Sequence, residues 1–255
     1  MNSDEAARFL NPVLEVEVGN RSVGRWVAQM GVTSDRRGRA DTCVLTVADT
    51  SGELGRSIKR GEALTIGWGY AGEDLTEIFQ GVAREVGIAD PLVIRGIDYN
   101  VILNSRRITT TFEGETASGI VKALLAGTGL KLAIEECDLE IERLPMFNRT
   151  LREGLEVVKE IIRSSGGETY DNYIREGVFH WERANLQTPT TQNYQTGVNI
   201  INTDRTPEGL IQLETLVSPV RHSELVSIDG IRHYVVKVEY WWNSGGRTRL
   251  EGYPC

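Results

Sequence analysis

The sequence predicts a mostly β protein of the α+β class, in which two strand-rich segments flank a short helical segment. Alternation of apolar and polar residues fills residues 12 to 104 and returns after Val198, whereas the apolar spacing of helices occurs only in between. The chain also has 27 glycines against 7 prolines. The glycines lie mostly between short apolar runs, where a tight turn needs a residue that tolerates positive φ, and this is typical of β-rich proteins.

The first strand-rich segment predicts a small antiparallel barrel or sandwich. Residues 12–18 alternate apolar with acidic side chains, and residues 23–30 follow after a Gly-Asn turn, so we expect these two strands to pair as a hairpin. The other predicted strands cover residues 41–48, 63–70, 75–86 and 91–98. Strands that recur about every 10–15 residues suit a barrel or a sandwich.

Two helices are predicted within a compact α+β segment over residues 108–184. A threonine of residues 109–116 can cap the first helix, which ends at Gly127-Thr-Gly129. The second begins at Thr150-Leu-Arg-Glu153, which has the spacing of a capping box, and ends at Gly166-Gly167. The expected apolar faces are Ile120, Val121, Leu124 and Leu125 on the first helix, and Leu151, Leu155, Val158, Ile161 and Ile162 on the second.

The rest of the chain is predicted to be β structure joined by a linker. A hairpin follows the second helix, from residues 168–174 to 178–181, and residues 185–199 read as a linker. Residues 223–242 hold an Asp229-Gly230 pair, which is a strong two-residue hairpin signal. A further turn leads to a last strand around residues 247–252.

Composition excludes several classes of protein. A length of 255 residues suits two or three small domains. The net charge of -8 argues against general affinity for nucleic acid, so we expect no specific nucleic-acid binding. The acidic start, Met1-Asn-Ser-Asp-Glu, does not resemble a secretory signal, and no stretch approaches the roughly 20 apolar residues of a membrane span, so we expect synthesis in the host cytoplasm and no membrane insertion.

No residue pattern predicts catalysis or metal binding. His180, His222 and His233 lie near no cysteine or carboxylate at metal-ligand spacing, so we interpret them as structural or surface residues, with His233 facing solvent. Cys43, Cys137 and Cys255 are odd in number and form no CxxC pair, and Cys43 reads as a buried strand residue. No nucleophile elbow such as GxSxG is present. The sequence therefore predicts no catalytic, cofactor-binding or metal residue, no cofactor, and a protein that is not an enzyme.

Three segments invite a functional interpretation, and a structural one explains each better. The acidic run Glu135–Glu142 could supply carboxylates for glycoside hydrolysis or calcium, but its alternation fits an edge strand that faces water. Gly67–Gly72 lacks the Lys-Ser/Thr of a phosphate loop and fits a hairpin bend. Tyr240-Trp241-Trp242 with Tyr253 could stack sugars or bases, but neighbouring strand residues face opposite sides, so core or subunit packing is favoured.

Three stretches carry a resemblance to a known family. They are the barrel segments 43–49, 58–66 and 78–86, then Phe112–Leu130, and then 147–155, 164–170 and 177–181. On these residues the sequence resembles the phage tail baseplate hub family, which includes late control protein D and the hub portions of type VI secretion spike proteins. The stretch Phe112–Leu130 is the most specific of the three.

The resemblance implies an assembly role. It implies two tube-type antiparallel β-barrel domains, residues 1–106 and a shorter 188–255, that flank an α+β domain with two helices at residues 107–187. Three copies would form a ring that joins the hexameric tail tube to the trimeric spike and lets DNA or an effector pass. The implied partners are the other copies of a homotrimer, a tail tube or distal tail protein, a central spike protein and the tape measure protein, in the tail baseplate of a virion.

Two other classes of function stay open at this point. One is a cell-wall or carbohydrate-binding module, or a hydrolase, at a tail tip, which would use the acidic strand around Glu140 and the Trp241-Trp242 region. The other is a simple ligand-binding barrel. The hub hypothesis differs from both because it predicts a trimer without turnover on peptidoglycan.

Overall fold

The chain divides into two compact units. The computed structural model describes residues 11–37, 40–87, 89–166, 168–175, 177–183, 190–243 and 245–255. We call the units the β unit, Met1–Asp98 with Leu186–Cys255, and the α+β unit, Tyr99–Asn185. The β unit is therefore built from both ends of the chain, and the α+β unit from one continuous stretch. The predicted start at Met1-Asn-Ser-Asp-Glu lies outside the described residues.

Two segments of chain contribute strands to the β unit. The first contains β1 (Pro12–Val18), β2 (Arg21–Ser22), the 3-10 helix η1 (Gly24–Trp26), β3 (Val27–Asp35), β4 (Thr42–Val47), the helix α2 (Glu53–Ser57), β5 (Ala63–Tyr70), β6 (Thr76–Val86) and β7 (Leu92–Asp98). The second contains β13 (Gln192–Tyr194), β14 (Ile200–Arg205), β15 (Ile211–Thr215), β16 (Leu225–Ile228), β17 (Ile231–Trp242) and β18 (Gly246–Pro254).

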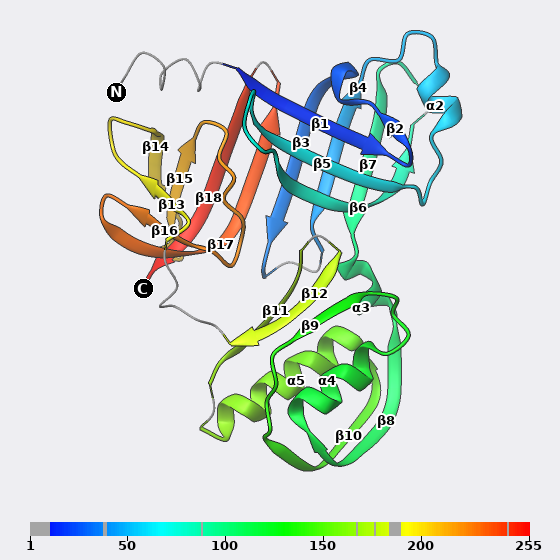
Figure 1. Ribbon diagram of the computed structural model, residues 1–255, viewed down its shortest axis with the longest axis vertical. Coiled ribbons are helices and arrows are strands. Elements are labelled where there is room, and N and C mark those ends of the chain that lie inside the picture. The colour runs from blue at the N-terminus through cyan, green and yellow to red at the C-terminus, as the bar shows by residue number, and fades with distance from the viewer. Residues whose placement is uncertain are drawn as a thin grey trace. The chain divides into compact units, whose positions relative to one another are not determined.

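Within the described residues, all these strands belong to one 13-stranded sheet. Its main path runs β14-β15-β18-β17-β3-β4-β7-β6-β5-β1-β2, and β13 and β16 branch from β17. The two segments meet where Lys237–Trp242 of β17 pairs antiparallel with Met30–Asp35 of β3. Figure 1 shows β1, β5 and β6 crossing over β3, β4 and β7, so the first segment curls into a half-barrel.

One hydrophobic core serves both segments of the β unit. Trp68 on β5 and Tyr240 on β17 are almost fully buried, and their rings meet edge to face with centroids 5.1 Å apart. The Tyr240 hydroxyl donates to the Val220 carbonyl oxygen at 2.6 Å, which satisfies the polar end of a buried ring. Residues from both ends of the chain thus depend on each other for burial.

The hairpin predicted between residues 12–18 and 23–30 is wrong. β1 pairs with the two-residue β2 and, along its whole length, with β5. After β2 the chain turns through η1 so close to β1 that a Cβ on Gly24 would lie 2.8 Å from the Leu14 carbonyl oxygen. β3 then pairs with β4 and β17. The four later strands of this segment are confirmed as β4, β5, β6 and β7.

The second segment contains both confirmed and unpredicted strands. Ile228 pairs with Ile231 across Asp229-Gly230, whose φ angles of 48° and 81° fit the predicted hairpin turn, and the last predicted strand is β18. The predicted linker is wrong at Gln192–Tyr194, which forms β13 with Tyr194 buried; residues 185–189 lie outside the described part. The division into domains at residues 106 and 187 stays a prediction, while the structure places both β segments in one sheet.

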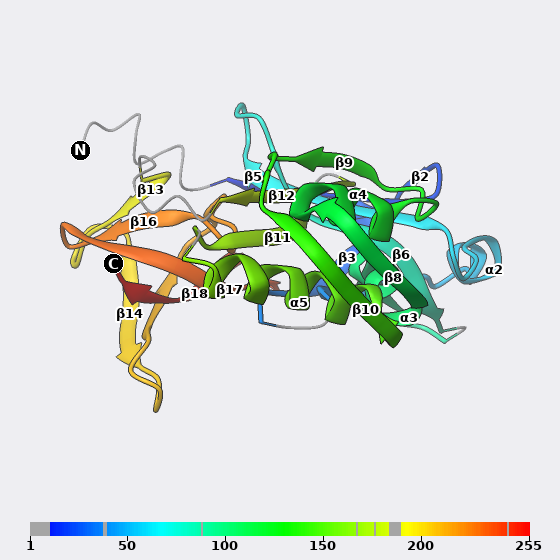
Figure 2. The ribbon, with the colours of Figure 1, turned by 90° about the horizontal axis from the view of Figure 1, so that it is seen from below.

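The α+β unit packs two helices between two small sheets. Its elements are α3 (Asn100–Ser105), β8 (Arg107–Thr116), α4 (Ala117–Leu125), β9 (Lys131–Ile134), β10 (Glu140–Thr150), α5 (Leu151–Ser164), β11 (Tyr170–Arg175) and β12 (Val178–Arg183). β8 pairs with β10, and β11, β12 and β9 form a three-stranded sheet with β9 parallel to β12. Figure 1 shows α4 and α5 between these sheets, and Figure 2 shows β8 and β10 side by side.

Both helices begin as the sequence predicts. The Thr116 hydroxyl accepts from the Gly119 backbone N–H at 3.1 Å at the start of α4. At the start of α5, the Thr150 hydroxyl accepts from the Glu153 N–H, and the Glu153 carboxylate accepts from the Thr150 N–H at 2.7 Å, which completes the capping box. The helix α5 ends at Ser164. Gly167 of the predicted stop and residue 176 of the predicted turn lie outside the described residues.

The α+β class with mostly β structure is confirmed. The sequence does not predict β2, η1, the short helices α2 and α3, or the strands β8, β9, β13, β14 and β15. The edge strand expected over Glu135–Glu142 is present only from Glu140, where β10 begins. In the described ranges, none of the helices has the length and apolar character needed to cross a membrane.

Candidate assembly surfaces

The face of the β unit's sheet that is turned away from the core carries a row of charged side chains. The strands β3, β17, β18 and β15 supply all but one of them in register, and Arg37 follows the end of β3. Val238, Tyr240 and Leu250, between the charged residues, point to the core. We call the row the charge ladder; its members are Asp35, Arg37, Gln212, Glu214, Lys237, Glu239, Arg249 and Glu251.

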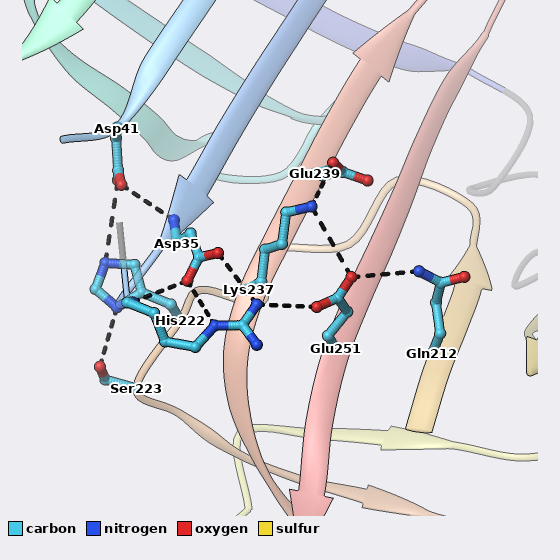
Figure 3. Close-up of polar contacts among 9 residues, drawn as sticks. Asp35, Asp41, Gln212, His222, Ser223, Lys237, Glu239 and Glu251 are labelled. Carbon is cyan, nitrogen blue, oxygen red and sulfur yellow. Dashed lines mark hydrogen bonds and ion pairs between the residues drawn. The ribbon is translucent and has the colours of Figure 1, made fainter. Parts of the chain in front are cut away.

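Glu251 is the centre of the charge ladder. Its carboxylate accepts from Arg37 Nη2 at 3.0 Å and from Gln212 Nε2 at 3.3 Å, and it lies 3.9 Å from Lys237 Nζ (Figure 3). Lys237 Nζ also lies 2.7 Å from Glu239 Oε1. Each of these contacts is partly exposed, so each contributes little to stability.

Every cation of the charge ladder is engaged by carboxylates. Arg249 lies 3.6 Å from Glu214 and 3.9 Å from Glu239, and Arg37 also contacts Asp35 at 3.1 Å. The four carboxylates outnumber the three cations of the row. This surface therefore offers no unpaired cation to hold a phosphate backbone, in agreement with the net charge of -8.

A histidine, an aspartate and two serines meet beside the charge ladder. Ser34 Oγ donates to Asp41 Oδ2 at 2.5 Å. His222 Nε2 lies 4.0 Å from the same oxygen, and His222 Nδ1 lies 2.9 Å from Ser223 Oγ (Figure 3). A general base needs its orienting carboxylate at about 2.6–3.2 Å. Asp41 instead bonds Ser34, so the group links β3 to the loop before β16 and does not form a catalytic triad.

The other two histidines make contacts within their own units. The expectation that His233 faces solvent is wrong: it is buried on β17, which is covered by partners on both sides, and its Nδ1 lies 2.9 Å from the Ile231 carbonyl oxygen. His180 stacks on Tyr173 with ring centroids 4.9 Å apart. Among the described residues, no group of three or more His, Cys, Asp or Glu side chains could hold a metal ion.

The acidic run Glu135–Glu142 does not gather its carboxylates into one site. Its strand β10 begins only at Glu140, and Ile141 is buried. The Glu136 carboxylate pairs with Lys122 and accepts from Ser118, and these contacts hold its pKa below the ordinary value. Glu135 pairs with Arg183 at 3.1 Å. Ion pairs with neighbouring elements account for Glu135 and Glu136.

The aromatic run is divided between two faces, as predicted. Tyr240 lies in the core, whereas the guanidinium of Arg249 stacks over the Trp241 ring at 5.0 Å. Tyr253 contacts Tyr234 at 5.7 Å between centroids. No common platform for sugars or bases results from these positions.

Two further predictions concern Cys43 and the glycine-rich segment. Cys43 is a buried strand residue, as predicted, and burial raises the pKa of its thiol to about 12, which keeps it protonated and unreactive. The bend predicted at Gly67–Gly72 is only partly right, because Ala63–Tyr70 continues as β5 and the turn begins at Ala71.

The β unit contains a pocket that the sequence does not reveal. It has a volume of about 490 Å³ and is lined by β5, the turn after it, and the loop before β16. Trp68, Tyr70, Tyr194 and Val217 form its apolar wall, and the exposed Glu73 and Asp74 lie at its rim. We call it the acidic-rim pocket. Burial, followed by the Glu73 charge, raises the pKa of Tyr70 to about 12.

The α+β unit displays an aromatic side chain on a bulge of β10. Phe147 is 81% exposed, and the pairing of β10 with β8 shifts register between Met146 and Arg149. Asn148 has a φ of 49°, its N–H donates to Thr109 Oγ1 at 3.0 Å, and its carbonyl accepts from Arg107 at 2.6 Å. We call this feature the Phe147 bulge. A phenylalanine is more often a core residue, so its exposure here is a finding of the structure.

Comparisons with known proteins find the fold but no sequence relative. No protein-family model and no curated protein matches the sequence. A 43 kDa tail protein of a Shewanella oneidensis prophage is similar in structure, with a TM-score of 0.74 and 12% identity over 95% of this chain and 97% of that chain. A tail protein of Neisseria meningitidis gives 0.72 and 13% over 95% and 96%.

A third similar structure belongs to a secretion apparatus. It is an E. coli component of the type VI secretion system, with a TM-score of 0.65 and 9% identity over 95% of this chain and 76% of that chain. The three matches each cover 95% of this chain, so the similarity of fold extends over both units. This chain therefore has the fold of phage tail proteins and of a type VI secretion component.

Proposed function

We propose that this chain is a structural hub protein of a phage or phage-like tail. Three copies form a ring that joins a hexameric tail tube to a trimeric spike, and DNA or an effector passes through its centre. The single observation that carries the proposal is the fold match with two tail proteins over at least 95% of both chains. The baseplate resemblance of the sequence agrees with it.

The sheet of the β unit supports an assembly role. Among the described residues, β14 pairs with β15 and makes one further bridge, from Ile200 to Thr196, and five of its six residues are exposed. At the other end of the described path, β1 is followed by the two-residue β2. Open strand edges of this kind favour pairing with another chain unless they are covered. Ring formation is one way to cover them, and the tube and spike proteins are further partners.

The excess of negative charge on this chain supports the proposal that a polyanion passes through the ring. The chain carries a net charge of -8, and the cations of the charge ladder are paired. A channel built from such a surface repels phosphates and does not retain them. The proposed place of the protein is the tail baseplate of the particle.

The proposal predicts the mass and the shape of the assembled protein. The purified full chain is measured by light scattering and imaged, alone and with its tube and spike proteins. The expected result is a mass of three copies and a threefold ring with a central channel. A strict monomer in the presence of both partners would contradict the proposal.

The same protein tests the rival carbohydrate-binding or hydrolase function. The hub proposal predicts that peptidoglycan is neither bound nor cleaved, because the Arg249 guanidinium stacks on Trp241, and Glu136 and Glu135 of the acidic run are paired with Lys122 and Arg183. Binding or lysis that is lost in Trp241→Ala or Glu140→Gln would favour the rival.

A further inference from the structure

The Phe147 bulge is built to hold its ring outward. Among the described residues, Phe147 is the most exposed of the large apolar side chains. Both backbone groups of Asn148 are bonded to side chains of β8, Thr109 and Arg107, so these two groups have protein partners. A bulge that re-aims a side chain is a typical device at functional surfaces.

The surroundings of Phe147 are basic. Arg107 and Arg149 are exposed on the strands that carry the bulge. The Glu153 carboxylate lies nearby and accepts from the Thr150 N–H. This hydrogen bond is the main cause of its lowered pKa, and the charges of Arg107 and Arg149 lower the pKa further. Beside Phe147, the two guanidinium groups outnumber the Glu153 carboxylate, although the whole chain has a net charge of -8.

The acidic-rim pocket has the complementary properties. Three aromatic rings, those of Trp68, Tyr70 and Tyr194, line it together with polar side chains such as Gln192 and Ser218. The exposed Glu73 and Asp74 also line it, and its volume of about 490 Å³ is large enough for a phenyl ring. Val198, which also lines it, is 66% exposed, so apolar surface extends to the mouth. Aromatic residues and arginine are the side chains most enriched at the centres of protein interfaces.

We propose that the Phe147 bulge of one copy docks in the acidic-rim pocket of a second copy, with Arg107 and Arg149 facing Glu73 and Asp74. This inference rests on the proposed ring and names a contact within it. The two surfaces differ and lie in different units, so the contact is heterologous, and a heterologous contact that closes on itself generates a ring. A second copy is the occupant because the same chain supplies both the basic aromatic projection and the acidic apolar recess.

The strength of self-association of the full chain tests the proposed contact between Phe147 and the acidic-rim pocket. Light scattering as a function of protein concentration measures self-association of the parent chain and of Phe147→Ala, which should associate about 30-fold more weakly, as expected for a buried aromatic anchor. Ile231→Ala is the matched control, because Ile231 is 58% exposed on the β16–β17 turn and belongs to neither surface. This control should associate like the parent chain.

A charge exchange separates a specific contact from a folding defect. Arg149→Glu and Asp74→Arg should each weaken association, and the chain with both substitutions should recover most of the parental association. Recovery would not follow from two independent losses of stability. Failure of the double variant to recover, or equal association of Phe147→Ala and the parent, overturns the inference.

Imaging of the ring distinguishes failure of the Phe147 contact from failure of the proposed function. A threefold ring that forms equally well with Phe147→Ala overturns this inference and leaves the proposed function in place. A parent chain that forms no assembly, even with the tube and spike proteins, overturns both. If Phe147 instead packs within its own chain, the substitutions leave the mass unchanged, which also overturns the inference.

Discussion

The two units of this chain are held together in different ways. In the β unit, β17 pairs with β3 from the other end of the chain, and Trp68 packs on Tyr240. In the α+β unit, a continuous stretch forms its own core, and both helices start at threonine caps a few residues from the groups they bond. The β unit thus depends on long-range pairing, whereas the α+β unit contains strong local signals.

The comparison predicts that removal of the C-terminal segment damages one unit only. A chain that ends at residue 189 loses β13 to β18, which leaves β3 without β17 and Trp68 without Tyr240. We expect β1 to β7 to lose their folded structure and the α+β unit to keep it. Hydrogen exchange should show fast exchange in peptides from residues 12–98 and protection in peptides from residues 99–183.

The control is the fragment of residues 99–185, which should unfold cooperatively by itself because its core is self-contained. Protected strands β1 to β7 in the truncated chain would contradict the comparison. That result would instead support an independent first domain that ends near residue 106.

The second largest effect is expected from a glycine inside the β unit. A Cβ on Gly81 would lie 2.2 Å from the Ile97 carbonyl oxygen and 2.7 Å from the Asp98 Cα, both backbone atoms of the paired strand β7. Gly81→Ala must therefore separate two strands, and we expect a loss of about 3 kcal/mol, at the upper end of overpacking costs. Denaturant unfolding followed by tryptophan fluorescence measures it.

Gly31→Ala is the matched control for this substitution. Gly31 lies on β3 of the same sheet, and a Cβ there would meet nothing within 4 Å. Its stability should stay near that of the parent chain. Equal losses for Gly31→Ala and Gly81→Ala would show that glycine flexibility, and not the close approach of strands, sets the effect.

The contrast between the units also explains what the sequence could predict. β4, β5, β7 and the β16–β17 hairpin alternate apolar and polar residues, so their positions follow from period two. β14 is exposed at five of its six positions, and β8 is rich in threonine and exposed on most residues, so the sequence of neither strand shows an alternation of buried and exposed positions. The pairing of β17 with β3 is set by tertiary packing and leaves no local trace.

The candidate surfaces are less predictable than the fold, because they too depend on the pairing of strands that lie far apart in the sequence. The charge ladder depends on the register of four strands, and the acidic-rim pocket joins Trp68 to Tyr194 and Val217 from the other segment. His233 was misjudged because a strand position next to a turn usually faces solvent, whereas both sides of β17 are paired there. Phe147 has one local signal, the Asn148 that follows it and takes positive φ.

A smaller effect is expected at the cap of α5. Thr150→Ala removes the acceptor of the Glu153 N–H, and loss of such a cap costs about 1 kcal/mol. The loss should be confined to the α+β unit, so hydrogen exchange should increase in peptides of α5 and not in those of β4 or β7. Thr110→Ala is the control, because Thr110 is an exposed threonine on β8 outside the cap. Equal changes in both units would mean that they unfold together.

The smallest expected effect compares one carboxylate in each unit under acid. The Glu153 carboxylate accepts from the Thr150 N–H, and in the β unit the Asp49 carboxylate accepts from the Gly55 and Leu54 N–H groups; these contacts lower both pKa values below the ordinary 4.5 and 3.8. A lowered pKa in the folded state adds stability above the ordinary value, and this is lost as the pH falls through the folded value. Glu153→Gln should therefore flatten the acid dependence of exchange in α5 only, and Asp49→Asn should flatten it in α2 only. If either substitution changes both helices, the units are coupled, and the separation between long-range and local stabilisation does not hold.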